Sequence, residues 1–205
     1  MPAVPNITFD ESYFRMDFVD NPEPAGYSDY GSEYTYYDER PDVLAGRIMD
    51  RLDSIGLAGK KVLVVGCAYG YTVEWLVSFG CDAYGLDISD FAISQAPAAI
   101  ASRVMVGDAR ASEDFEAAKL LAGLEKKNDK FDLVFDEDMI MCLTDAEAAT
   151  FQGNALAVGK YLAHLYSPFP HLATYYNYHE ISEWKTILNC LPTERWFARF
   201  GLAEV

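Results

Sequence analysis

Asp87 and Asp136 directly follow short apolar runs, and Asp108 and Glu137 each follow such a run after one intervening residue. Such runs, rich in β-branched and aromatic residues, are typical of buried strands in a parallel sheet. A carboxylate at the tip of such a strand can accept hydrogen bonds from both hydroxyls of a ribose. Asp87, with the turn that precedes its strand, therefore predicts a nucleoside site at the carboxyl edge of a sheet.

A turn of small residues precedes the first of these acids. Residues 62–65 (VLVV) predict a buried strand, residues 66–70 (GCAYG) a tight turn, and residues 72–79 a helix that Gly80 ends. A second strand then leads to Asp87, which completes one βαβ unit with a right-handed crossover. Small residues in the turn let the backbone approach a ligand closely.

The glycine spacing distinguishes between kinds of nucleoside site. A dinucleotide-binding turn has glycine at its first, third and sixth positions, where this chain has Gly66, Ala68 and Tyr71. The spacing therefore disfavours an NAD-dependent oxidoreductase, although that enzyme, or another nucleoside-binding enzyme of similar fold, stays an alternative. A binding or structural protein that keeps the fold without its chemistry is a third possibility.

Strand and helix signals alternate over the next hundred residues, which predicts an α/β fold with a doubly wound, mostly parallel sheet covered by helices on both faces. Outside the first unit, helices are expected at 41–55, 89–96, 112–127, 144–158 and from 182, and strands at 104–106, 131–135, 161–166 and 196–200. Ser89 is expected to cap the helix at 89–96, and Thr144 with Glu147 is expected to form a capping box at the start of the helix at 144–158.

The first 41 residues differ in composition from the rest. They are rich in tyrosine and acidic residues and are interrupted by proline and glycine, so we expect an ordered arm rather than a long helix. The arm would be either a strap across the domain or a lid over the ligand, with residues 27–37 as its centre. Residues 42–205 are expected to form a single domain.

Composition narrows the possible partners. The formal net charge of the 205 residues is −16, which disfavours a nucleic-acid partner. No apolar run reaches the ~18 residues of a membrane helix, and the N-terminus does not resemble a signal peptide. Scattered cysteines predict reduced thiols and a cytoplasmic setting, and the histidines show no spacing suited to a metal site.

Four segments, in this order, resemble class I S-adenosylmethionine-dependent methyltransferases, with small phage and bacterial members nearest. They are the turn at 66–70, the run GLDISDFAI at 85–93, the turn Gly107-Asp108-Ala109, and the segment FDLVFDEDMIMCL at 131–143. The resemblance implies a Rossmann-like fold and S-adenosylmethionine as the cofactor. Two positions depart from the family's pattern: Val64 stands where many members have an acid, and Ala68 replaces the middle glycine.

The resemblance also implies a role for each matched residue. The backbone of Gly66, Cys67, Ala68 and Gly70 would pass under the methionine and ribose parts of the cofactor. Asp87 would bind the ribose hydroxyls, Ile88 would pack on adenine, and Asp108 would accept the adenine amino group beside Ala109. Asp136 and Glu137 would flank the sulfonium, with Glu137 as the candidate catalytic residue.

The expected reaction is therefore methyl transfer to a small-molecule or protein acceptor. The acidic cluster at 136–138 would suit an amine acceptor, because a carboxylate can stabilise the amine or take its proton.

Overall fold

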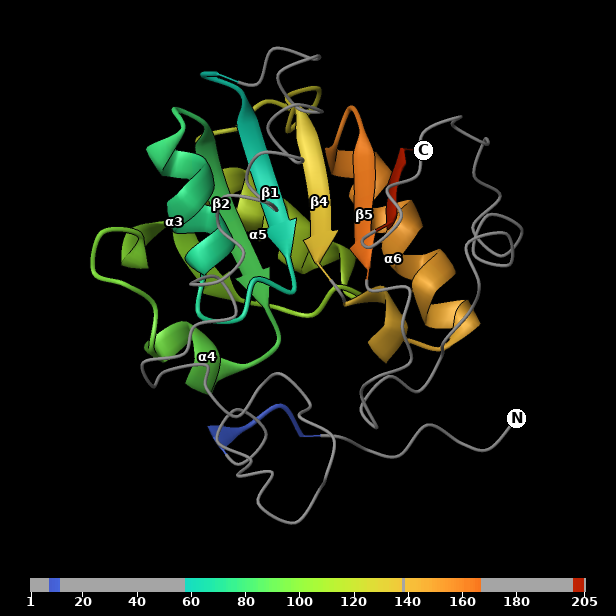
Figure 1. Ribbon diagram of the computed structural model, residues 1–205. Coiled ribbons are helices and arrows are strands. Elements are labelled where there is room, and N and C mark those ends of the chain that lie inside the picture. Colours follow the sequence, from blue (N-terminus) through green and yellow to red (C-terminus); the bar gives the residue numbers. More distant parts are fainter. Residues whose placement is uncertain (1–7, 12–57, 138, 167–200, 205) are drawn as a thin grey trace.

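The computed structural model describes residues 8–11, 58–137, 139–166 and 201–204 (Figure 1). The expected helices at 41–55 and from 182, the strand at 196–200 and the arm segment 27–37 lie outside these residues. The boundary between an arm and a domain near residue 41 also stays a prediction.

One sheet forms the centre of the molecule, with the strand order β3-β2-β1-β4-β5-β6 (Figure 1). The first five strands along this order run parallel, and β6 pairs antiparallel with β5. The predicted mostly parallel sheet is therefore confirmed. The strands are β1 (Lys61–Val65), β2 (Asp82–Asp87), β3 (Val104–Val106), β4 (Leu133–Glu137), β5 (Leu162–Tyr166) and β6 (Gly201–Glu204).

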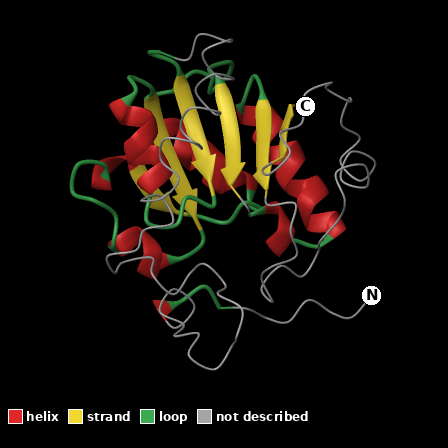
Figure 2. Cartoon of the chain, viewed as in Figure 1, coloured by secondary structure: helices red, strands yellow, loops and turns green. Residues whose placement is uncertain are grey.

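Helices cover both faces of this sheet (Figure 2). Alternate residues of β1 face opposite sides, so Val62 and Val64 pack with α3 while Leu63 and Val65 pack with α5 and α6. The predicted doubly wound α/β fold is thus confirmed. The described helices are α3 (Tyr71–Ser78), α4 (Asp90–Ser94), α5 (Ser112–Leu121) and α6 (Asp145–Val158), with short 3₁₀ turns η2 (Ala101–Arg103) and η3 (Ile140–Cys142).

Local capping fixes where several helices begin. The Ser89 hydroxyl accepts the Ala92 N–H at 3.0 Å, as expected for an N-cap residue. Thr144 and Glu147 form the predicted reciprocal capping box at the start of α6. Because these caps need only side chains within three residues of each other, the sequence predicts them well.

Three predicted boundaries are wrong. Helix α5 ends at Leu121, well before residue 127, because Gly123 turns the chain with φ +68°. Helix α4 ends at Ser94 rather than residue 96. Strand β4 spans Leu133–Glu137 instead of 131–135, since Leu133 is the residue that aligns with Val62 of β1. Asp136 and Glu137 therefore lie inside a strand and not after it.

Within the described ranges, no helix combines the length and the apolar character needed to cross a lipid bilayer.

Candidate functional site

The turn after β1 adopts a conformation that suits small residues. Gly66 and Gly70 have φ angles of +75° and +79°, and Ala68 between them has φ +47°. Alanine rarely adopts this left-handed region, so Ala68 holds a glycine-like backbone at the middle position of the turn. At Gly70 a side chain would also collide with the Ile100 side chain, since an added Cβ would lie 2.6 Å from its Cδ1.

Backbone hydrogen bonds hold this turn against the end of β2. The N–H groups of Gly66 and Cys67 both donate to the Leu86 carbonyl, and the Gly70 N–H donates to the Cys67 carbonyl. The Ala68 N–H donates to the Asp87 carboxylate at 2.7 Å. These donors are used within the protein, so the turn offers a ligand close backbone approach rather than a set of amide donors.

Asp87 is the last residue of β2, and its side chain connects the turn to α4. One carboxylate oxygen accepts the Ala68 N–H and the other accepts the Ser89 N–H at 2.8 Å. Burial raises the pKa of this carboxyl above its ordinary value of 3.8, although both amide bonds oppose the shift. Each oxygen keeps a second lone pair, so the carboxylate fits a pair of hydroxyl donors.

Apolar side chains are exposed beside Asp87. Ile88 is 45% exposed, and Val106, which pairs with Asp87 across the sheet, is 46% exposed. Exposed side chains of this kind beside a carboxylate fit a flat heteroaromatic base. Val106 was not predicted from the sequence, although its place at the end of an apolar run directly before Gly107-Asp108 could have indicated it.

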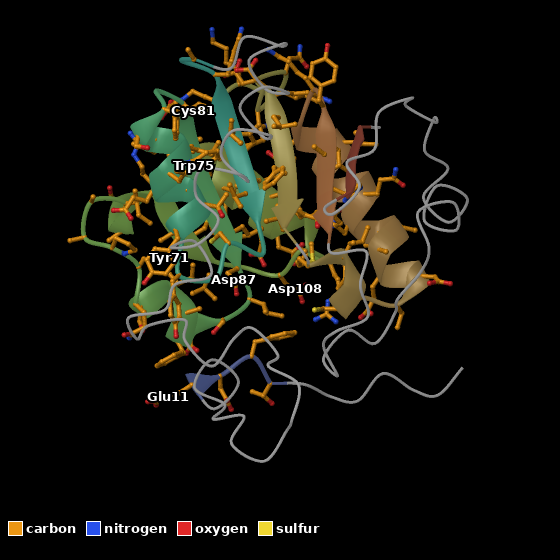
Figure 3. The ribbon with its side chains drawn as sticks, viewed as in Figure 1. Glu11, Tyr71, Trp75, Cys81, Asp87 and Asp108 are labelled. Carbon is orange, nitrogen blue, oxygen red and sulfur yellow. The ribbon has the colours of Figure 1, made fainter. Side chains whose placement is uncertain are left out.

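Asp108 follows β3 and lies at the same edge of the sheet as Asp87 (Figure 3). Its carboxylate is held by Arg110, whose Nε and Nη2 donate to Oδ1 and Oδ2 at 2.8 and 2.7 Å. The Asp108 N–H donates to Asp114 in α5. Ala109 is buried beside it. The expected contact of Asp108 with an adenine amino group stays a prediction.

Asp136 differs from the other strand-end acids because it is fully buried. Its Oδ2 lies 2.5 Å from Nδ1 of His164 on β5, and the His164 ring packs edge-on against Phe151 of α6. Within the described residues, Asp136 Oδ1 and His164 Nε2 have no hydrogen-bond partner. The carboxylate thus faces the core under α6, and its expected place beside a sulfonium stays a prediction. The roles of Glu137 and the 136–138 cluster stay predictions too, and Asp138 lies outside the described residues.

An N-terminal segment also lies at this edge of the sheet. Phe9 packs against the cluster formed by Tyr69, Ala92 and their neighbours from the turn and α4. The Tyr69 ring lies 6.4 Å from the Phe91 ring in an edge-to-face arrangement. In Figure 3, Glu11 lies at the same end of the molecule as Asp87 and Asp108. Among the described residues, no group of three or more His, Cys, Asp or Glu side chains could hold a metal ion.

Comparison with known proteins agrees with this geometry. Residues 63–152 match the family model described as a methyltransferase domain. A search of curated protein sequences found no match to the chain.

Solved structures of similar fold span most of the chain. Magnesium protoporphyrin IX methyltransferase from Synechocystis PCC 6803 with bound SAH is 19% identical, with 85% of this chain and 89% of that chain covered and a TM-score of 0.53. The PH0226 protein from Pyrococcus horikoshii OT3 is 18% identical, with 84% and 91% covered and a TM-score of 0.63. A TehB-like SAM-dependent methyltransferase from Corynebacterium glutamicum ATCC 13032 is 16% identical, with 82% and 94% covered and a TM-score of 0.53.

The matched region contains the turn, the ends of β2 and β3, all of β4 and the capping box of α6. The resemblance seen in the sequence is therefore confirmed: residues 63–152 match a methyltransferase-domain model, and the chain shares the fold of solved class I methyltransferase structures.

Proposed function

We propose that the protein transfers a methyl group from S-adenosylmethionine to a small-molecule or protein acceptor. The observation that carries the proposal is the Asp87 carboxylate, held at the carboxyl end of β2 by the N–H groups of Ala68 and Ser89. It lies between the small-residue turn, which it contacts, and the exposed apolar side chain of Ile88. Asp87 can therefore match a ribose diol, Ile88 a base, and the turn a methionine chain.

In this proposal each group of residues has one task. Asp87 accepts the ribose hydroxyls through its remaining lone pairs, and Ile88 covers one face of the adenine. The turn from Gly66 to Gly70 lets the methionine part pass close to the backbone. When bound, S-adenosylmethionine supplies an electrophilic methyl group on a sulfonium.

Methyl transfer asks the protein mainly for positioning. Holding two reacting groups near attack distance can contribute about 7–11 kcal/mol to lowering the barrier. Glu137, at the end of β4, is the group we propose to orient the acceptor or take its proton. Asp136 gives little support to an amine acceptor, since its carboxylate faces His164 in the core.

We further propose that the acceptor is not a nucleic acid. The net charge of −16 supports this, and several of the described cations, among them Arg103, Arg110 and Lys160, pair with a carboxylate. A gel-shift experiment at low salt with mixed DNA and RNA should show no complex. Tight binding that weakens steeply with added salt would contradict the proposal.

An N-terminal arm that closes over the cofactor is also part of the proposal, and the packing of Phe9 on the Tyr69 cluster supports it. Cofactor should then slow amide hydrogen exchange across residues 27–37 as well as in the turn. A cytoplasmic setting is proposed as well, which the buried thiol of Cys81 suits.

The direct test is a calorimetric titration with three ligands. S-adenosylmethionine and S-adenosylhomocysteine should bind, and NAD should not. Binding of NAD alone would favour an oxidoreductase. If the methyl donor binds but no labelled methyl group reaches any pool of small molecules or proteins, the result would favour a protein that has kept the fold without the chemistry.

A further inference from the structure

Arg110 makes an unusually complete contact with the carboxylate that follows β3. Its guanidinium donates from Nε and Nη2 to the two oxygens of Asp108 at 2.8 and 2.7 Å, and its backbone N–H donates to Oδ1 at 2.8 Å. In the described part of the chain, all hydrogen-bond donors to this carboxylate come from Arg110. The guanidinium lowers the pKa of Asp108 below its ordinary value of 3.8.

The guanidinium is itself held from a second side. Its Nη1 donates to Glu147 Oε1 at 2.7 Å. Glu147 is fixed in turn by the capping box, because its other oxygen accepts both the N–H and the hydroxyl of Thr144 at 2.9 and 2.8 Å. Two ion pairs therefore hold Arg110 between the loop after β3 and the first turn of α6.

The backbone that carries Asp108 is also tightly packed. An added Cβ at Gly107 would lie 2.3 Å from Leu86 Cδ1 and 3.0 Å from Asp114 Cβ. The Asp108 N–H is held by the Asp114 carboxylate at 2.8 Å. The position of Asp108 is thus fixed by its backbone, and the orientation of its carboxylate is fixed by Arg110.

We propose that Arg110 is a positioning residue that presents Asp108 to the adenine amino group and makes the site select adenine. A carboxylate has about four lone-pair positions, and Arg110 brings three N–H groups to them. Its Nε is shared between the two oxygens, with a longer bond of 3.1 Å to Oδ2, so Oδ2 is the oxygen that can accept one further donor. The ion pair with Arg110 suits a neutral amino group better than a second cation, because the carboxylate charge is already paired.

This inference rests on the proposed function, and one titration series separates the two. The ligands are S-adenosylhomocysteine and S-inosylhomocysteine, in which an oxo group replaces the adenine amino group. The wild-type protein should prefer the adenosyl ligand by at least about tenfold, since the analogue leaves the remaining acceptor position of Asp108 unmatched. If the wild-type protein binds neither ligand, the proposed function itself fails.

The variants are Arg110→Ala and Arg110→Lys, where lysine keeps the charge but lacks the planar fork. Both should lose most of the preference through weaker binding of S-adenosylhomocysteine, with nearly unchanged affinity for the inosyl ligand. The matched control is Arg103→Lys, which alters a comparable ion pair with Asp82 near the other end of β3. It should keep the full preference.

The ratio of the two affinities is the deciding readout, because a merely structural role for Arg110 would weaken both ligands equally. A preference that survives in both Arg110 variants overturns the inference, as does an equal loss for both ligands. Thermal unfolding of each variant checks that the compared proteins are folded at the titration temperature.

Discussion

Asp87 and Asp136 lie on the two strands that flank β1, yet their side chains have opposite surroundings. Leu86 of β2 and Asp136 of β4 both pair with Val65, so Asp87 lies one residue further along the sheet than Asp136. Because side chains alternate between faces, one step changes the environment completely. Asp136 faces the core under α6 with His164, and Asp87 reaches the turn at the edge of the sheet.

The partners of the two acids show what this single step does. Asp87 accepts two backbone N–H groups, which are neutral and leave its charge available to a ligand. Asp136 is paired with an imidazole inside a closed apolar core. We infer that Asp87 acts in binding and Asp136 in stability, and the following variants test this division.

The largest effect is expected from Asp136→Ala. It removes the partner of a buried imidazole and leaves a cavity, which should lower the free energy of unfolding by about 3 kcal/mol. Urea unfolding measures the loss. Cofactor affinity of the folded protein should change far less than it does for a change at Asp87.

A double-variant cycle with His164→Ala tests whether the two side chains act as a pair. The combined loss of stability should be clearly smaller than the sum of the single losses. If Asp136→Ala instead weakens cofactor binding strongly while the protein stays stable, Asp136 flanks the sulfonium and the division between the two acids is wrong.

Asp87→Ala should act on binding. Loss of the charged hydrogen bonds to the ribose should weaken S-adenosylmethionine binding by about 1–3 kcal/mol. Calorimetry gives the affinity, and Asp82→Ala, at the other end of β2, is the matched control because its partners Lys61 and Arg103 lie away from the turn. Unchanged affinity in Asp87→Ala would remove the central claim.

The contrast between these acids also marks what could be predicted from sequence. The ends of β2 and β3 and the caps at Ser89 and Thr144 are local features, and the sequence predicted them. The two-residue error in β4 arose because pairing with β1, a contact between distant residues, decides where that strand begins. That error hid the burial of Asp136, and the contact of Arg110 with Glu147 was hidden for the same reason, since 37 residues separate them.

A pH titration distinguishes the binding acid in a second way. The pKa of Asp87 is raised by burial, so the folded protein holds this proton more tightly than the unfolded chain. Its contribution to stability therefore falls as pH rises from 3.8 through the raised pKa. Cofactor affinity should rise over the same range, by at most about tenfold per pH unit, because only the carboxylate accepts both hydroxyls.

The matched variant for this titration is Asp87→Asn, which should flatten both curves. When the variant's curve is subtracted from the wild-type curve, the contributions of the other carboxyls drop out. Among them are Asp82 and Asp132, whose pKa values are lowered by ion pairs. Those groups stabilise the fold above their ordinary pKa and lose that contribution as pH falls. A wild-type affinity that does not change across the range would show that Asp87 does not titrate in the site.

Ile88→Ala should have a smaller effect, and on binding alone. The side chain is already 45% exposed, so stability should hardly change. Loss of its contact with adenine should weaken cofactor binding by about 1 kcal/mol. Leu120→Ala removes an exposed side chain of the same size from α5 and should leave the affinity unchanged; equal affinities for the two variants would place adenine elsewhere.

Ala68→Gly should give the smallest effect and the opposite sign. Ala68 has φ +47°, a conformation that costs alanine about 1–2 kcal/mol and glycine almost nothing. Glycine loses about 0.5–1 kcal/mol more than alanine in chain entropy on folding, so the free energy of unfolding should rise by between zero and about 1.5 kcal/mol. The bond from the residue 68 N–H to Asp87 is retained, so cofactor affinity should stay within about twofold of wild type.

Ala117→Gly in α5, where the backbone is helical, is the control and should lower stability by about 1 kcal/mol. A loss of stability in Ala68→Gly as well would mean that the Ala68 methyl group, packed in the cluster with Phe9 and Tyr69, contributes more than the backbone strain costs.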